Sequence, residues 1–140
     1  MLNLIKKGYW NMPKIEVSVG ELVDKITILK IKEDMIRDEA KLKYVREELE
    51  VLENCLYSEN ISVPQEMIDK LYKINSELWD TEDVIRACER DRDFSEAFVE
   101  AARLDAILND KRFLAKNEIN KHSESVIKEQ KSYEGLYTAD

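Results

Sequence analysis

Residues 18–36 read SVGELVDKITILKIKEDMI, and this stretch decides the fold of the chain. Ser18 and Glu21 form a capping box, in which the hydroxyl accepts a free backbone N–H and the carboxylate reaches back to the cap. Apolar side chains then recur at the spacing of one helix face: Leu22, Ile26, Leu29 and Ile36, flanked by Val23, Ile28 and Met35. The pattern predicts an amphipathic helix that ends near residue 37 and needs other helices to cover its apolar side.

The segment 39–57 predicts a second helix, which Asp38 precedes as an N-cap. Its apolar residues recur in the alternating three- and four-residue spacing of close antiparallel packing. These residues are Leu42, Val45, Leu49, Leu52 and Leu56. Because the connection to the first helix is short, the two helices are expected to form a hairpin.

Two longer helices are predicted in the second half of the chain. The first begins after its cap Ser62, with Gln65 at the box position, and runs to about residue 90. The second spans residues 94–120 after a capping box that begins at Asp93. Each would be roughly 40 Å long at about 1.5 Å per residue, too long for the first two helices to cover.

The predicted fold class is therefore all-α, an antiparallel helical bundle of about four main helices arranged as two hairpins. A short extended N-terminal segment and a partly ordered C-terminal tail are expected to flank it. We expect residues 1–12 to be an N-terminal extension and residues 13–140 to form one domain. The composition agrees, since 37% charged residues with only three Gly and two Pro are typical of long helices.

The charge of the chain limits its partners. A formal net charge of −8 predicts no nucleic-acid partner and no binding to an anionic membrane, because both need clustered Lys and Arg. No apolar run approaches the roughly 20 residues of a membrane span, and the N-terminus has no signal-peptide core. We therefore expect a cytoplasmic protein.

Residues with catalytic or metal-binding chemistry are sparse. Cys55 and Cys88 lie on apolar stripes without metal-ligand spacing, which predicts two buried thiols. His122 is the single histidine and no Gly-rich phosphate loop is present, so we predict no metal site and no cofactor. Acidic pairs three residues apart, such as Glu77 and Asp80, occur in helical Mg²⁺-dependent enzymes. With 30 acidic residues in the chain, such pairs also arise by chance.

Polar residues replace apolar ones along the predicted fourth helix. Asp105, Asn109, Arg112, Lys116 and Asn120 fall at successive helical spacings. A polar row on an inward side must be paired or hydrated, because an unpaired buried charge is very costly. One interpretation is a structural network with Glu82 or Asp83 and Arg86 on the third helix. The other is a polar pocket for an anionic small ligand, with Arg112 and Lys116 as its charge partners.

The first helix adds Asp24 and Lys25 to the candidate residues. Lys25 has Glu21 four residues earlier, which predicts a local ion pair. Asp24 has no cationic residue at a helical spacing, so any cation for it must come from another helix or from a ligand.

Six stretches in order and spacing resemble a small family of uncharacterised bacterial and phage proteins over about residues 13–133. They are GELVDKITILKIK at 20–32, LKYVREELEVL at 42–52, LWDTEDVIRACE at 78–89, NDKR at 109–112, EIN at 118–120 and EQKSY at 129–133. The resemblance implies no established activity, and it links the chain to surface-polysaccharide or phage processes. If the family has a site, the resemblance places it at Glu21, Asp24, Lys25, Trp79, Asp83, Arg86, Asn109, Asp110, Arg112, Asn120, Lys131 and Tyr133.

We predict a non-catalytic binding or accessory module with an anionic small molecule or a protein as its partner. The predicted ligand-binding residues are Asp24, Lys25, Asp83, Arg86, Asn109, Arg112, Lys116 and Asn120. A homodimer is expected, because the uncovered ends of the long helices would expose Trp79 or Phe113. The alternative is an enzyme acting on a phosphorylated or anionic substrate, either like a Mg²⁺-dependent nucleotide pyrophosphohydrolase or like a helical mutase.

Overall fold

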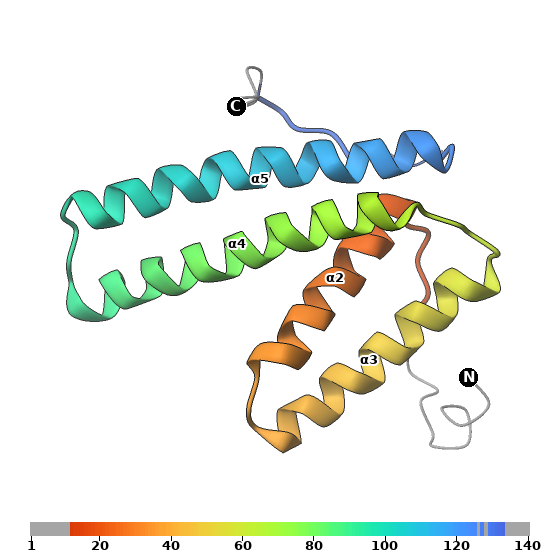
Figure 1. Ribbon diagram of the computed structural model, residues 1–140, viewed down its shortest axis with the longest axis horizontal. Helices are drawn as coiled ribbons and strands as arrows, with labels where there is room; N and C mark the ends of the chain where they lie inside the picture. The colour runs from red at the N-terminus through yellow and green to blue at the C-terminus, as the bar shows by residue number, and fades with distance from the viewer. Residues whose placement is uncertain (1–11, 126, 128, 134–140) are drawn as a thin grey trace.

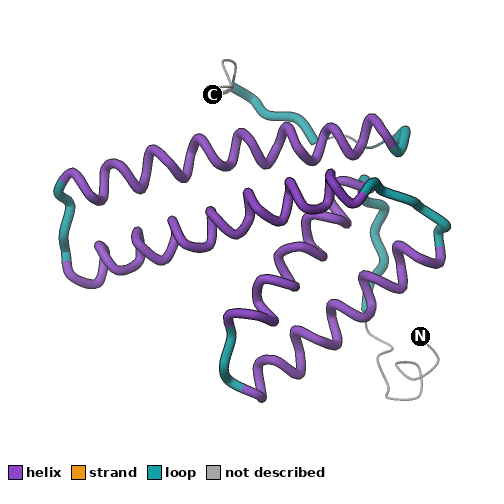
Figure 2. The backbone as a smooth tube through the Cα atoms, viewed as in Figure 1, coloured by secondary structure: helices purple, strands orange, loops and turns teal. Residues whose placement is uncertain are grey.

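The computed structural model describes residues 12–125, 127 and 129–133. Within them the chain forms four helices and no strand: α2 (Val19–Met35), α3 (Glu39–Ser58), α4 (Gln65–Asp91) and α5 (Glu96–His122) (Figure 2). The predicted all-α class and the two hairpins are confirmed. The predicted extension at residues 1–12 lies outside the described residues except for Met12.

The two hairpins differ in length, and they contact each other through one helix, α2. α4 and α5 form the long hairpin, and α2 and α3 form a shorter one set across one end of it (Figure 1). α2 contacts α3, α4 and α5, whereas α3 packs on α2 and on neither helix of the long hairpin. The far half of the long hairpin therefore extends beyond α2 (Figure 1).

The first two helices begin where their capping residues predict. The Ser18 hydroxyl accepts the N–H of Glu21 at 3.1 Å. Asp38 Oδ1 accepts the N–H groups of Ala40 and Lys41 at 2.9 and 3.1 Å. These bonds satisfy backbone donors that have no partner within the first turn of a helix.

The two long helices begin later than predicted. Pro64 rather than Ser62 occupies the N-cap of α4, and no side chain caps that helix. Proline needs no partner for a backbone N–H, which suits it to a helix start. At α5, Asp93 accepts the N–H of Ser95 at 3.0 Å in the preceding turn, so Ser95 becomes the N-cap and Asp93 does not.

Two apolar cores meet at α2, one on each side of it. One side contributes Val23 to a core with Leu71, Ile74 and Leu78 of α4 and Leu108, Ala115 and Ile119 of α5. The other side packs Leu22, Ile26 and Leu29 against Val45 and Leu49 of α3. A helix that is apolar on both sides is buried between its neighbours, and this burial holds the two hairpins together.

Gly20 allows α2 to approach α5 closely. A Cβ atom at this position would collide with the backbone carbonyl oxygen of Lys116. The Gly20 N–H donates to Asn120 Oδ1 at 2.7 Å, so the first turn of α2 is bonded directly to α5. This approach brings the polar residues of α2 onto the polar row of α5.

Several side chains differ in burial from the sequence prediction. Cys88 is buried as predicted, but Cys55 is exposed because α3 is covered on its α2 side alone. Phe113 is 8% exposed, so the prediction that it is uncovered is wrong, and Trp79 is half-buried. Ile15, in the segment before α2, is 78% exposed.

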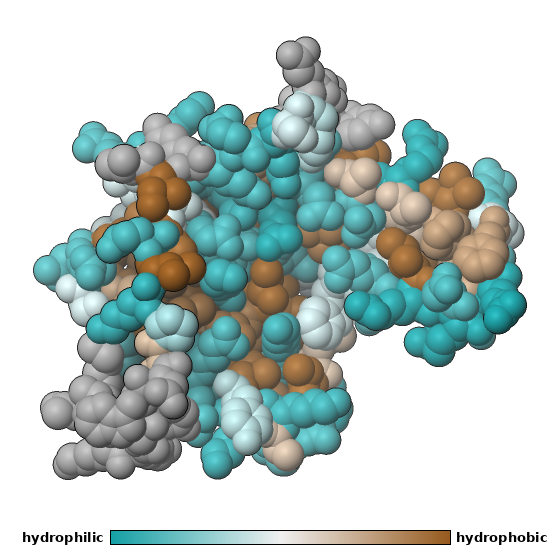
Figure 3. Space-filling view, turned by 180° about the vertical axis from the view of Figure 1, so that it is seen from behind, coloured by the Kyte–Doolittle hydropathy of each residue, from teal (hydrophilic) through white to brown (hydrophobic). Residues whose placement is uncertain are grey.

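The end of the long hairpin that α2 does not reach carries exposed apolar side chains: Val84, Phe94, Val99 and Leu104. Figure 3 shows apolar surface gathered over this end. In the described part of the chain, the four helices include none that combines the length and the apolarity needed to cross a bilayer.

Candidate functional site

A buried carboxylate on α2 is the centre of the polar contacts between the hairpins. Asp24 has no exposed surface. Arg112 of α5 donates to it twice, from Nε to Oδ1 at 2.9 Å and from Nη2 to Oδ2 at 2.5 Å. Asn75 of α4 donates to Oδ1 at 2.9 Å. Of the two sources predicted for the cation of Asp24, another helix or a ligand, the structure shows the first.

Thr27, one turn along α2, completes the set of bonds around Asn75. The Thr27 hydroxyl donates to the backbone carbonyl of Asp24 at 2.8 Å and accepts from Asn75 Nδ2 at 2.9 Å. Both N–H groups of the Asn75 amide are thus used on α2. Buried polar groups that are fully bonded in this way fix the relative position of their helices.

Lys116, one turn after Arg112 on α5, is the second buried cation. Its side chain is 6% exposed, and its Nζ lies 2.7 Å from Glu21 Oε2 and 2.9 Å from Glu129 Oε2. Glu21 comes from α2, whereas Glu129 comes from the residues that follow α5. Lys131 lies 3.5 Å from the other oxygen of Glu129.

The residues after α5 return along that helix and cover part of it (Figure 1). We call the described residues 125, 127 and 129–133 the C-terminal segment. Lys131 Nζ lies 5.8 Å from the centre of the Phe113 ring. The Tyr133 hydroxyl donates to Asp110 Oδ1 at 3.0 Å. The segment thereby buries Phe113, which the sequence pattern left uncovered.

These three parts of the chain enclose a polar hollow of about 230 Å³. We call it the charged hollow, and its walls come from α2, α5 and the C-terminal segment. It is lined by Glu21, Asn109, Arg112, Phe113, Lys116, Glu129 and Lys131. Together with Asp24 behind Arg112, the site holds three cationic and three acidic side chains.

The surroundings keep these groups ionised. Burial alone would raise the pKa of Asp24, but the bonds from Arg112 and Asn75 outweigh it and hold that pKa below its ordinary value. Burial likewise opposes ionisation of Lys116, yet Glu129 and Glu21 raise its pKa above the ordinary value. The pKa of Glu129 is lowered, because its bond to Lys116 overcomes partial burial.

Four of the eight predicted ligand-binding residues lie together here besides Asp24. Arg112, Lys116 and Asn109 line the charged hollow, and Asn120 anchors the first turn of α2. The amide of Asn109 donates to the backbone carbonyl of Asp105 at 3.0 Å, within α5.

The other three predicted residues lie elsewhere. Lys25 is exposed and pairs with Glu21 at 3.7 Å, as the local spacing predicts. Asp83 and Arg86 are exposed on α4 and make no hydrogen bond or ion pair with a described residue, so the predicted network between α4 and these α5 side chains is wrong. Because α2 lies across the long hairpin, Arg112, Lys116 and Asn120 of α5 pair with α2 instead.

Sequence reasoning missed Asn75, Thr27 and Glu129. Asn75 and Thr27 were detectable as polar residues beside the apolar positions of their own helices. Glu129 had no signal apart from its place in the EQKSY stretch, because the C-terminal segment has no periodic pattern. Of the positions that the resemblance marks in this segment, Lys131 lines the hollow and Tyr133 bonds to Asp110 of α5.

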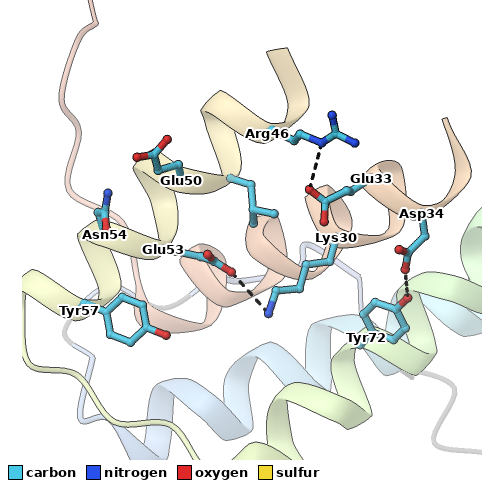
Figure 4. A pocket seen from close by; sticks show the side chains of 10 residues that line it. Lys30, Glu33, Asp34, Arg46, Glu50, Glu53, Asn54, Tyr57 and Tyr72 are labelled. Carbon is cyan, nitrogen blue, oxygen red and sulfur yellow. Dashed lines mark hydrogen bonds and ion pairs between the residues drawn. The ribbon is translucent and has the colours of Figure 1, made fainter. Parts of the chain in front are cut away.

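A larger hollow of about 530 Å³ lies between α2 and α3, with Tyr72 of α4 at its edge (Figure 4). Its charged side chains pair with one another across the opening, as Lys30 does with Glu53 at 3.6 Å and Arg46 with Glu33 at 3.7 Å. These side chains are more than a third exposed, and exposed ion pairs are weak. The charged hollow, with a buried lysine in its wall, is the better-built site.

The described residues include no group of three or more His, Cys, Asp or Glu arranged to hold a metal ion.

Neither a curated protein nor a solved structure matches the chain. Residues 13–139 match a family of unknown function (DUF6165). The match spans nearly all of the chain and confirms the predicted membership of an uncharacterised family. The chain therefore belongs to the family of unknown function DUF6165.

Proposed function

We propose that the protein is a non-catalytic binding module whose charged hollow takes a small oxyanion, a carboxylate or a phosphate group. One observation carries this proposal: Arg112, Lys116 and Lys131 come from two parts of the chain and line the same hollow of about 230 Å³. Pockets for drug-sized ligands measure about 300–1,000 Å³, so this hollow suits a single small group.

Arg112 is held in place and still has donors to offer. Asp24 accepts from Nε and Nη2, while Nη1 has no hydrogen-bond partner among the described residues. A guanidinium carries five N–H donors in a rigid fork that matches carboxylate and phosphate oxygens. Because Asp24 fixes the fork before any ligand arrives, little side-chain entropy would be lost on binding.

The directions of the pKa shifts support binding over acid–base catalysis. A general acid or base works best with a pKa near the operating pH. Here the pKa values of the Asp24 and Glu129 carboxyls are lowered and the pKa of Lys116 is raised. All three pKa values therefore move further from neutral pH. The cytoplasmic location, which the composition predicts, and the link to surface-polysaccharide or phage processes, which the family resemblance implies, belong to the same proposal.

Thermal melting with inorganic phosphate and with succinate tests this function. A ligand that binds the folded state alone raises its stability by about 1.4 kcal/mol at ten times the dissociation constant. We expect such a rise for the wild type and its loss in Lys131→Met. The exposed Lys121 on α5 lies outside the hollow, so Lys121→Met has the same charge change and should melt like the wild type with ligand.

Two results would contradict the proposal. One is the absence of any rise in melting temperature with either anion. The other is an equal rise in Lys131→Met and in the wild type, which would place the binding elsewhere on the surface.

A further inference from the structure

We infer that Glu129 occupies the oxyanion position of the charged hollow and that a bound ligand takes its place. This inference rests on the proposed function and names how the same site is regulated. Glu129 is the described carboxylate that pairs with both lysines of the hollow, with Oε2 2.9 Å from Lys116 and Oε1 3.5 Å from Lys131. Each oxygen faces a different ammonium group, as the oxygens of a bound carboxylate would.

The charges of the site explain why Glu129 and a ligand compete. With Glu129 in place, the three cations are balanced by Glu21, Asp24 and Glu129. Without it, the site has three cations and two carboxylates, an excess of one positive charge. An incoming carboxylate or phosphate would restore the balance, whereas binding beside Glu129 would place a third anion next to the buried ammonium of Lys116, which already contacts Glu21 and Glu129.

Glu21 does not fit the same role, although it lies as close to Lys116. It belongs to the first turn of α2, whose position is fixed by the two apolar cores. Its second oxygen pairs with the exposed Lys25 rather than with another residue of the hollow. Glu21 is therefore a permanent part of the wall.

Glu129 can leave without disturbing either apolar core. The C-terminal segment contributes no residue to either apolar core. Besides the lysine pairs, it is held by the Tyr133 bond to Asp110, the Lys131 contact with Phe113 and the Val19 N–H bond to Ser125 Oγ at 3.1 Å. Segments with few buried contacts open at low free-energy cost compared with global unfolding.

The variant Glu129→Gln tests this inference, because it keeps the shape of the side chain and removes its charge. We would titrate the variant and the wild type separately with sodium acetate and with inorganic phosphate, following backbone amide and Arg112 Nε–H signals by NMR. We expect the variant to bind about fivefold more tightly, which corresponds to about 1 kcal/mol. The anion whose affinity increases more in the variant shows whether the site favours a carboxylate or a phosphate.

Glu118→Gln is the matched control. Glu118 pairs with Lys70 on the exposed surface, so the change in net charge is the same and the hollow is untouched. We expect it to bind both anions like the wild type. Equal or weaker binding by Glu129→Gln, with the wild type still binding, would overturn the displacement and leave the proposed function standing. No binding by either protein would overturn both.

Discussion

Replacing Arg112 with Met removes the cation from a fully buried carboxylate. Asp24 would keep its bond from Asn75 and lose both bonds from the guanidinium. Breaking a buried ion pair on one side costs about 3–5 kcal/mol, because an uncompensated charge remains. Since domains have about 5–15 kcal/mol of stability in total, Arg112→Met should lose a large part of it.

The pH dependence of the same variant reverses in sign. In the wild type the folded state lowers the pKa of Asp24. Its contribution to folding stability is therefore complete above the unfolded-state pKa and is lost as the pH falls through the folded-state pKa. Without Arg112, burial raises the pKa of Asp24. The folded state of the variant then binds more protons at Asp24 than the unfolded state does. The variant therefore gains stability from this carboxyl as the pH falls toward the unfolded-state pKa of Asp24.

Urea unfolding at several pH values measures both effects. The double variant Asp24→Leu with Arg112→Met should recover most of the loss, because an apolar pair of similar volume replaces the ion pair. A loss below about 1 kcal/mol in Arg112→Met would refute the reasoning, since it would match an exposed ion pair. A double variant as unstable as Arg112→Met would refute it equally.

Three further predictions concern the packing, the acid sensitivity and the assembly of the protein. Gly20→Ala should cost about 1–3 kcal/mol in urea unfolding, because the new methyl group meets the fixed carbonyl of Lys116 and separates α2 from α5; an unchanged midpoint would contradict this approach. Wild-type stability should fall as the pH drops below about 4, since Asp24 and Glu129 have lowered pKa values; a flat urea midpoint from neutral to acid pH would contradict it. A homodimer stays a prediction, and sedimentation should give about twice the 16.5 kDa mass of the chain; a monomer mass would contradict it.

The sequence predicts the elements of this fold well, because their determinants are local. Ser18 and Asp38 cap helices where the pattern places them, and the apolar spacing predicts both hairpins. The predicted cap at Ser62 is wrong, because Pro64 is the N-cap and α4 begins at Gln65. Such errors move a helix boundary by one turn at most and leave the fold class unchanged.

The partners of the polar residues could not be predicted in the same way. The spacing identifies Arg112 and Lys116 as inward-facing cations but pairs them with α4. The actual partner of Arg112 is Asp24, 88 positions away, and that of Lys116 on the helices is Glu21, also on α2. Both contacts depend on how α2 crosses the long hairpin. That crossing is set by close packing at Gly20 and by two apolar cores, which no periodicity within one helix encodes. The burial of Phe113 is not predicted either, because the C-terminal segment that contacts it has no periodic sequence.

Mapping of phosphate binding by NMR tests the central claim most directly. Inorganic phosphate would be titrated into the labelled wild type while the Arg112 Nε–H signal and all backbone amides are recorded. We predict one saturating curve shared by Arg112, Lys131 and Glu129. Chemical-shift changes that are spread over exposed lysines such as Lys30 and Lys70 and do not saturate, with no change in the Arg112 Nε–H signal, would contradict it.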